Sequence, residues 1–165
     1  YPFTPQPIIT QALLLAADIP VFAGVGGGLT KGQRVVNLAM FAEMQGATGV
    51  VLNAPTANAV VQHVAETIDI PVVVTVARAD TDFEARLQAG ANIFNVSAAA
   101  ETPAIVRSIR ERYPDVPIIA TGGPTDESIL ETIQAGANAI TWTPPSNGEI
   151  FRDIMAAYRE NKPHP

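Results

Sequence analysis

Six short stretches of the chain are apolar at nearly every position, and polar or amphipathic segments separate them. Strands that are apolar on both faces are typical of a parallel sheet that helices cover. The pattern therefore predicts six buried strands. Their expected bounds are Val21–Val25, Gly49–Asn53, Val72–Val76, Ile93–Val96, Ile118–Thr121 and Ala139–Thr143.

The segments between the strands have a helical pattern, as in the recurrence of Ile105, Ile109 and Tyr113 on one helix face. A further helix is expected before the first strand, at about residues 6–17, and a last one from about Gly148 to Asn161. Three segments begin with a capping-box spacing, in which two side chains bond each other's backbone amides. These pairs are Thr30 with Gln33, Thr81 with Glu84, and Ser146 with Glu149.

The strand starts repeat along the chain. DIPVFAG, DIPVVVT and DVPIIAT open the first, third and fifth strands, and QGATGVV, QAGANIF and QAGANAI open the other three. The chain therefore contains three copies of a module of two strands and two helices, and a period of this kind indicates the architecture of the whole fold.

Alternating strands and helices predict an α/β fold with a parallel sheet. One possible closure is the eight-stranded TIM barrel, which usually takes about 250 residues. The other is an open doubly wound sheet, for which six strands is a normal number. We favour a single (βα)6 barrel-like domain over residues 1–165, short of eight strands, and keep the open six-stranded sheet as the alternative. A missing N-terminal module, a partner subunit or the N-terminal helix would fill the gap.

The composition and net charge of the chain exclude some classes of binding partner. Of the 165 residues, 47% are hydrophobic and 16% charged, as in a globular protein. The net charge of -6 disfavours nucleic acids and anionic membranes, and no apolar run reaches membrane-spanning length. The chain has no cysteine, which fits a cytoplasmic protein and excludes thiolate chemistry. An incomplete barrel exposes an edge or an apolar hole, so we expect a homo-oligomer.

The candidate site lies where the strands end, because ligands of both folds bind at the carboxyl ends of the strands. Gly122 and Gly123 follow the fifth strand, where backbone amides at a helix start can bind phosphate. Gly24, Gly26 and Gly27 follow or end the first strand in the loop AGVGGGLTKG, which does not have P-loop spacing. In both places the structural alternative, a turn or loop that requires glycine, is equally good.

Arg78 and Asp80 form the only charged cluster at a strand end. Arg78 can hold a carboxylate or phosphate with two hydrogen bonds, and Asp80 can act as a general base or a magnesium ligand. In the alternative interpretation Asp80 and Thr81 cap a helix and Arg78 is solvated. Polar or stacking residues at the other strand ends and helix starts complete the candidate ligand contacts. They are Asn53, Asn95, Ser97, Thr121, Trp142, Thr143 and Ser146.

Several catalytic groups are missing from the strand ends. The only lysines, Lys31 and Lys162, lie in a loop and in the tail, so no Schiff-base lysine is expected. His63 and His164 lie away from the strand ends, and no metal-ligand spacing involves them. The predicted site at the carboxyl ends of the strands is polar and nearly uncharged, which suits ligand binding better than acid-base chemistry.

The stretch IIATGG…AGANAI resembles the penultimate strand and turn of the phosphate-binding TIM-barrel superfamily, including tryptophan-synthase-alpha, aldolase and FMN-linked types. IPVFAGVGGG…GATGVVLNAPT is similar to dihydrodipicolinate-synthase-type aldolases and phosphoenolpyruvate-hydrolase-like barrels. The resemblance implies an anionic ligand at the Gly122–Gly123 turn. The last strand departs from the family pattern, because it ends TWTPPSNG, with a bulky Trp142 and a late glycine.

Three functions remain as hypotheses. The first is a lyase, isomerase or hydrolase that acts on a small phosphorylated or carboxylated metabolite. The second is a non-catalytic barrel that binds or senses such a metabolite. The third is an FMN-binding barrel. The candidate residues do not require a cofactor. If the protein does use one, Mg²⁺ and FMN are the two candidates.

Overall fold

The structure is a computed structural model and describes residues 5–142, 146–160 and 162. Helices and strands alternate after a first helix, as the sequence predicts. The helices are α1 (Pro7–Ala16), α2 (Gln33–Met44), α3 (Asn58–Ala65), α4 (Phe83–Gln88), α5 (Thr102–Arg112), α6 (Asp126–Gln134) and α7 (Asn147–Arg159), with a short 3-10 turn at Ala99–Glu101. The strands are β1 (Phe22–Gly26), β2 (Gly49–Leu52), β3 (Val72–Val76), β4 (Ile93–Val96), β5 (Ile118–Thr121) and β6 (Ala139–Thr141).

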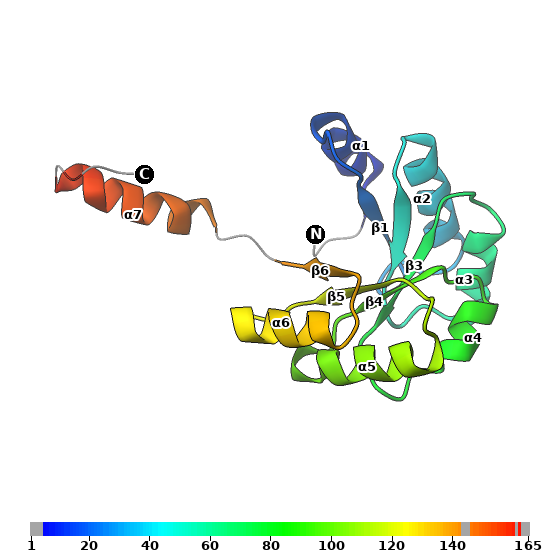
Figure 1. Cartoon of the computed structure of the whole chain (residues 1–165). Coiled ribbons are helices and arrows are strands. Elements are labelled where there is room, and N and C mark those ends of the chain that lie inside the picture. Colours follow the sequence, from blue (N-terminus) through cyan, green and yellow to red (C-terminus); the bar gives the residue numbers. More distant parts are fainter. Residues whose placement is uncertain (1–4, 143–145, 161, 163–165) are drawn as a thin grey trace.

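The six strands form one parallel sheet in the order β1-β2-β3-β4-β5-β6, so each strand pairs with the next one in sequence. The sheet curls into a half-barrel, with α2 to α6 on its convex side (Figure 1). This confirms the barrel-like prediction. The open doubly wound alternative is wrong, because that fold needs a reversal of strand order.

Three predicted strands, β3, β4 and β5, have the expected bounds. The first strand is shifted by one residue at each end and the second stops one residue before Asn53. Thr143, the predicted end of the last strand and a candidate ligand contact, lies outside the described residues.

The core lies between the sheet and its helices. Val50, Leu52 and Phe94 point to the helix side and are completely buried. On the concave side Val73 is also fully buried, but Phe22 remains 38% exposed. The prediction of burial on both faces is therefore correct on β3 at Val73, but the concave residues of β4 and β5 are only half-buried, and both edge strands are exposed, at Phe22 on β1 and at Ala139 and Thr141 on β6.

The repeated AGAN sequence has a specific structural role. Gly90 and Gly136 end their helices with φ of 100° and 110°, a conformation that favours glycine. Two residues later an asparagine side chain bridges to the preceding strand: Asn92 Oδ1 accepts from the amide of Val72 at 2.8 Å, and Asn138 Oδ1 accepts from that of Ile118 at 2.9 Å. The repeat thus joins neighbouring strands at their amino ends.

The predicted helix starts are only partly correct. Ser146 and Glu149 form the expected capping box of α7. Thr30 does not cap α2, whose N-cap is Gly32, with no side-chain cap. The cap of α4 is Asp82 rather than Thr81, since its carboxylate accepts from the amide of Ala85 at 3.0 Å.

Two helices lie outside the regular strand-helix layers. α1 lies beside β1, at one edge of the sheet, and α7 stands clear of the body beyond β6 (Figure 1). In the described part of the chain, no helix combines the length and the apolar character needed to cross a membrane.

Candidate functional site

A polar stripe lines the concave face at the carboxyl ends of the strands. Asn95 on β4 donates from Nδ2 to Thr75 Oγ1 on β3 at 3.2 Å. Thr141 on β6 donates to Thr121 Oγ1 on β5 at 3.4 Å. Thr75 and Thr141 were not among the predicted site residues. The alternation of side chains along a strand could have identified Thr75. It lies two positions after Val73, which faces the concave side, and it pairs with Asn95 on the neighbouring strand.

An open cavity at this edge has a volume of about 640 Å³. It brings together four of the predicted contacts, from three strand ends, and adds two residues. Its lining consists of Ser97, Thr121, Gly123, Pro124, Thr141 and Trp142. Trp142 is 64% exposed, so it does not fill the core, and its ring is accessible for stacking.

The Gly122–Gly123 turn requires both glycines for packing alone. A Cβ on Gly122 would lie 2.7 Å from side-chain atoms of both Ile129 and Ile140. Gly123 has φ of 82°, and its Cβ would lie 2.6 Å from Ser128 Oγ. The Gly122 amide already donates to the carbonyl of Thr141 at 3.3 Å. An anion at this turn would therefore rely on the Gly123 amide and the neighbouring hydroxyls.

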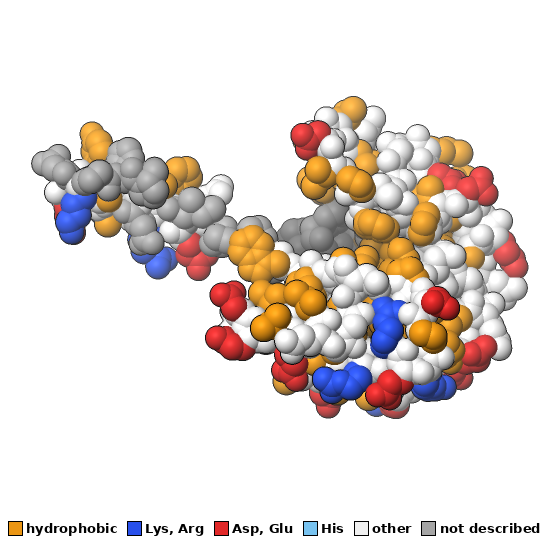
Figure 2. All heavy atoms as spheres, viewed as in Figure 1, with side chains coloured by type: hydrophobic (Ala, Val, Ile, Leu, Met, Phe, Trp, Pro, Cys, Tyr) orange, Lys and Arg blue, Asp and Glu red, His pale blue; other side chains and the backbone are white. Residues whose placement is uncertain are grey.

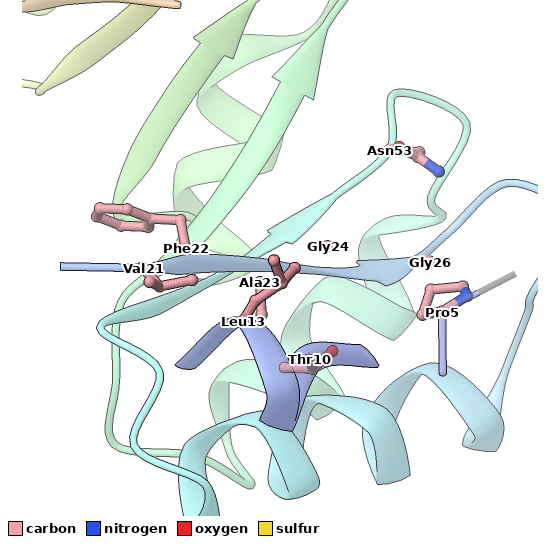
Figure 3. Close-up of a pocket in the computed structure, with 9 residues that line it drawn as sticks. All are labelled: Pro5, Thr10, Leu13, Val21, Phe22, Ala23, Gly24, Gly26 and Asn53. Atoms are coloured by element: carbon pink, nitrogen blue, oxygen red, sulfur yellow. The ribbon is translucent and has the colours of Figure 1, made fainter. Parts of the chain in front are cut away.

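The glycines after the first strand lie in a different place. A second cavity, of about 250 Å³, opens between α1 and β1 (Figure 3). Gly24, Gly26 and Asn53 line it together with apolar side chains of both elements. The sequence places the predicted contacts in one site at the strand ends. In the structure Gly24, Gly26 and Asn53 line this cavity, Gly27 lines another, and neither group lines the 640 Å³ cavity.

Gly26 and Gly27 tie the loop after β1 to the loop after β2. The carbonyl of Gly26 accepts from the amide of Asn53 at 2.9 Å. A Cβ on Gly27 would lie only 1.7 Å from Thr56 Oγ1. That hydroxyl donates to the carbonyl of Asn53 at 2.7 Å, so the contact is part of a fixed turn.

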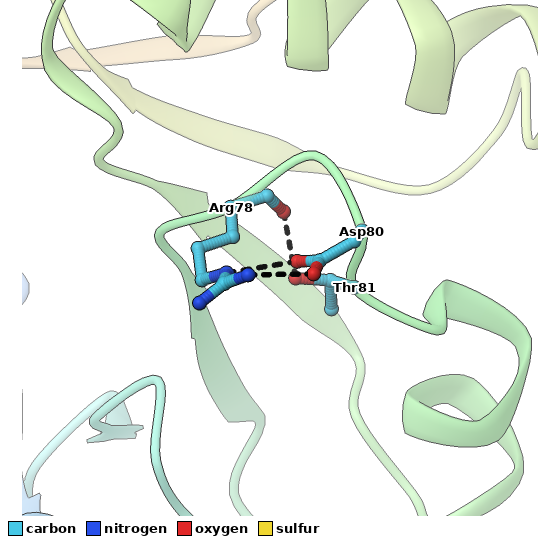
Figure 4. A network of polar contacts seen from close by, with 3 residues as sticks. All are labelled: Arg78, Asp80 and Thr81. Atoms are coloured by element: carbon cyan, nitrogen blue, oxygen red, sulfur yellow. Dashed lines mark hydrogen bonds and ion pairs between the residues drawn. The ribbon is translucent and has the colours of Figure 1, made fainter.

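Arg78 and Asp80 form an exposed bidentate ion pair after β3 (Figure 4). Arg78 Nε and Nη2 donate to the two Asp80 oxygens at 2.9 and 2.7 Å. The hydrogen bond from Arg78 lowers the pKa of the Asp80 carboxyl below its ordinary value, and the same bond raises the pKa of Arg78. Thr81 Oγ1 donates to the Arg78 carbonyl at 2.7 Å. Both Asp80 oxygens therefore accept from Arg78, and Asp80 does not cap α4.

Arg78 and Asp80 do not line the 640 Å³ cavity, and neither do the candidates Asn53 and Ser146. Asn53 lies at the β1–β2 end, as described above. Ser146 is engaged in the cap of α7, where its Oγ donates to Glu149 Oε2 at 2.7 Å, and hydrogen bonds from Ser146 lower the pKa of Glu149. No group of three or more His, Cys, Asp or Glu side chains that could hold a metal occurs within the described ranges. Because both Asp80 oxygens bind Arg78, these residues do not fit a protein-built magnesium site.

No protein-family model and no curated protein matches the sequence. Solved structures do match, with TM-scores well above those of unrelated folds. A phosphonopyruvate hydrolase in complex with oxalate and Mg²⁺ has a TM-score of 0.70 at 14% identity, over 94% of this chain and 66% of that chain. The likeness is one of fold.

Two further matches have the same character. 2,3-Dimethylmalate lyase, a member of the PEP mutase/isocitrate lyase superfamily, has a TM-score of 0.67 at 12% identity, over 94% of this chain and 66% of that chain. N-acetylneuraminate lyase from Mycoplasma synoviae has a TM-score of 0.68 at 16% identity, over 94% and 56%. The likeness to aldolase-type and phosphoenolpyruvate-type barrels expected from the sequence is thus confirmed at the level of fold, and the chain spans only part of these larger barrels.

Proposed function

We propose that this chain is a barrel-type enzyme of the lyase, isomerase or hydrolase class that acts on a small phosphorylated or carboxylated metabolite. The observation that carries the proposal is the cavity at the carboxyl ends of β4, β5 and β6, where hydroxyl groups, the Gly123 turn and an exposed tryptophan converge. The proposal is supported by the similar fold of solved enzymes, which include two lyases and a hydrolase.

The ligand's anionic group would bind the hydroxyls of Ser97, Thr121 and Thr141 and the amide of Gly123. The Thr141 hydroxyl makes only long bonds, of 3.4 Å to Thr121 Oγ1 and to the Ala120 carbonyl. Well-formed hydrogen bonds of a hydroxyl are about 2.5–3.0 Å long. The Thr141 hydroxyl can therefore rotate toward a ligand and lose only weak hydrogen bonds. The N-terminus of α6 does not add to this anion site, because Asp126 and Glu127 already occupy its first turn.

Arg78 and Asp80 would supply the chemistry by exchanging partners. A substrate carboxylate or phosphate offers Arg78 the same two-oxygen geometry that Asp80 offers now. When Arg78 binds the substrate, Asp80 loses the hydrogen bond that lowers its pKa and becomes a stronger base. Binding of the anion would in this way prepare the base that removes a proton from the substrate.

A non-catalytic metabolite-binding barrel is the second candidate, and one observation favours it. None of the described residues that line the 640 Å³ cavity is titratable. Such a cavity can orient a ligand by hydrogen bonds and stacking without transferring protons.

Binding and turnover can be tested separately on the purified chain. Calorimetry with phosphate, phosphoenolpyruvate, pyruvate, oxalate and FMN, each with and without Mg²⁺, measures binding. Thr141→Val should abolish binding of the active ligand, whereas the matched control Thr67→Val, at an exposed position just after α3, should not. If neither the parent chain nor the control binds any of these ligands, the proposal is wrong.

For a ligand that binds, proton nuclear magnetic resonance of the mixture detects product formation. Asp80→Asn should retain binding and lose turnover if the chain is an enzyme. Binding without any turnover in the parent chain would favour the non-catalytic barrel.

A further inference from the structure

The cavity between α1 and β1, which we refer to as the α1 cavity, is separate from the candidate site described above. Its volume is about 250 Å³, and it shares no lining residue with the 640 Å³ cavity. Most of its walls are apolar side chains of the two elements, among them Leu13, Val21 and Phe22 (Figure 3). Figure 2 shows apolar side chains gathered where α1 meets the sheet. An apolar cavity of about 150 Å³ can hold benzene, so the α1 cavity has room for a ring with a small substituent.

Gly24 lines this cavity, and the fold of the chain does not require a glycine there. Its φ lies outside the positive region that favours glycine, and a Cβ at this position would meet no atom within 4 Å. The bulge of β1 does not explain it either, because the positive φ of that bulge falls on Gly26. Glycine weakens a strand, and one use of it is to let a ligand approach the backbone closely. In the described part of the chain no strand pairs with the outer edge of β1, so this backbone is open to such an approach.

Thr10 supplies a buried hydroxyl to the same cavity. It is the one buried residue of α1, with 8% of its surface exposed, and it lies on the side of the helix that faces β1 (Figure 3). Its only side-chain hydrogen bond goes to the Gln6 carbonyl at 3.5 Å, which is well beyond the usual length of about 2.7–2.8 Å for a hydroxyl donor. The Thr10 hydroxyl is therefore buried without a good partner, although buried polar groups are nearly always hydrogen-bonded.

Gln45 supplies a second polar group that lacks a partner. Its Oε1 is buried and makes no hydrogen bond with any of the described residues. Gln45 lines a narrow cavity between α1 and α2, and Thr10 and Gly24 line both this cavity and the α1 cavity. Two poorly satisfied polar groups thus lie around the glycine that leaves the backbone open. Leaving a buried acceptor unpaired costs about 1–3 kcal/mol, so a donor from a ligand would be favourable here.

The chemistry of the walls defines the ligand. None of the described residues that line the two cavities is titratable, and an unpaired charge is costly to bury. Gln45 Oε1 can only accept a hydrogen bond, and the Thr10 hydroxyl can accept or donate one. We propose that the α1 cavity is a second ligand site, for a neutral molecule about the size of one ring that carries a hydroxyl or amide N–H donor.

Three probes of similar shape test this chemistry on the isotope-labelled chain, by nuclear magnetic resonance titration. Benzyl alcohol has a neutral ring and a hydroxyl donor, toluene has the ring alone, and benzoate carries a charge. Benzyl alcohol should bind, toluene should bind about 2- to 13-fold more weakly, as expected for the loss of one hydrogen bond, and benzoate should not bind. Failure of benzyl alcohol to bind, or equal affinities for the three probes, would overturn the proposal.

Two variants test the residues. Gly24→Leu places a side chain in the cavity and should abolish binding of benzyl alcohol, whereas Gly148→Leu is a matched control in α7, where a Cβ would meet its nearest atom at 3.9 Å, and should bind as the parent does. Thr10→Val keeps the shape of the side chain and removes the hydroxyl. It should reduce the affinity for benzyl alcohol to that for toluene and leave the affinity for toluene unchanged. A merely structural role of Thr10 would instead change both affinities equally, and that result contradicts the proposal.

The same titration locates the ligand. The amide resonances of Thr10, Leu13 and Gly24 should shift when benzyl alcohol is added, and those of Gly123 and Thr141, which line the 640 Å³ cavity, should not. Shifts confined to Gly123 and Thr141 would place the probe in the other cavity and overturn the proposal. The result does not depend on whether an anion binds at the carboxyl ends of β4, β5 and β6.

Discussion

Replacing Gly27 by alanine tests how far the glycines after the first strand are structural. Gly27 has φ of 96°, and a Cβ there would lie 1.7 Å from Thr56 Oγ1 and 3.2 Å from the Asn53 amide nitrogen. Neither contact is with the flexible end of a long side chain. Gly24 is the matched control, since a Cβ there would meet no atom within 4 Å.

The expected loss of stability has three contributions. A left-handed backbone conformation costs alanine about 1–2 kcal/mol, and overpacking of a closely packed site costs about 1–3 kcal/mol. Thr56 must also turn away and lose its 2.7 Å bond to the Asn53 carbonyl, which is worth about 0.5–1.5 kcal/mol. The free energy of unfolding should therefore fall by about 3–6 kcal/mol, and the Tm by about 6 °C or more.

Urea denaturation followed by circular dichroism measures this difference. Gly24→Ala should be neutral or stabilise the fold by about 0.4–1 kcal/mol, because alanine restricts the unfolded chain. The double variant Gly27→Ala with Thr56→Ala should regain part of the loss, since it removes the hydroxyl but keeps the backbone strain. Equal stabilities of Gly24→Ala and Gly27→Ala would refute the reasoning.

Three further changes are predicted. Arg78→Gln should raise the pKa of Asp80 back toward its ordinary value, measured by carbon-detected nuclear magnetic resonance, because the hydrogen bond from Arg78 lowers it. The folded pKa of Asp80 is depressed, so the ion pair's contribution to stability is present above the ordinary pKa and is lost as the pH falls through the folded value. Arg110→Ala should lower the free energy of unfolding by about 1–3 kcal/mol in urea, because Arg110 donates to the Gly136 carbonyl at 2.8 Å and to Asn138 Oδ1 at 2.7 Å. Ser146→Ala should speed amide hydrogen exchange in α7, since loss of an N-cap costs about 0.5–2 kcal/mol, and an unchanged rate would contradict the role of the capping box.

The sequence predicts the architecture well because the strands are continuous apolar runs and the AGAN repeat has one structural function. In that repeat the helix-ending glycine and the strand-bridging asparagine occur together, as at Gly136 and Asn138. The glycine acts at its own helix end, and each asparagine accepts from an amide 20 residues earlier, a separation that the repeat keeps constant. Local patterns of this kind are sufficient to define three of the six strands to the residue.

Helix starts are predicted less well because neighbouring polar side chains compete for the same cap, and site residues are predicted less well because they depend on neighbours that are far apart in the sequence. Thr81 has the spacing of a cap, but its hydroxyl bonds the Arg78 carbonyl in the same turn, and Asp82 caps α4 instead. Thr141 becomes a site residue only because β6 lies beside β5, which places it next to Thr121. A sequence pattern contains no information on such pairings until the strand order is known.

The glycines provide the clearest distinction between structural and functional roles. At Gly27, Gly122 and Gly123, packing or a positive φ already explains why no side chain is present, so these residues by themselves do not indicate a ligand. Gly24 differs, because its position in β1 would accept a Cβ without any contact, and it lines the cavity beside α1. An anion-binding role at the Gly122–Gly123 turn must therefore rest on the hydroxyls that surround it, and above all on Thr141, whose long hydrogen bonds leave it free to bind a ligand.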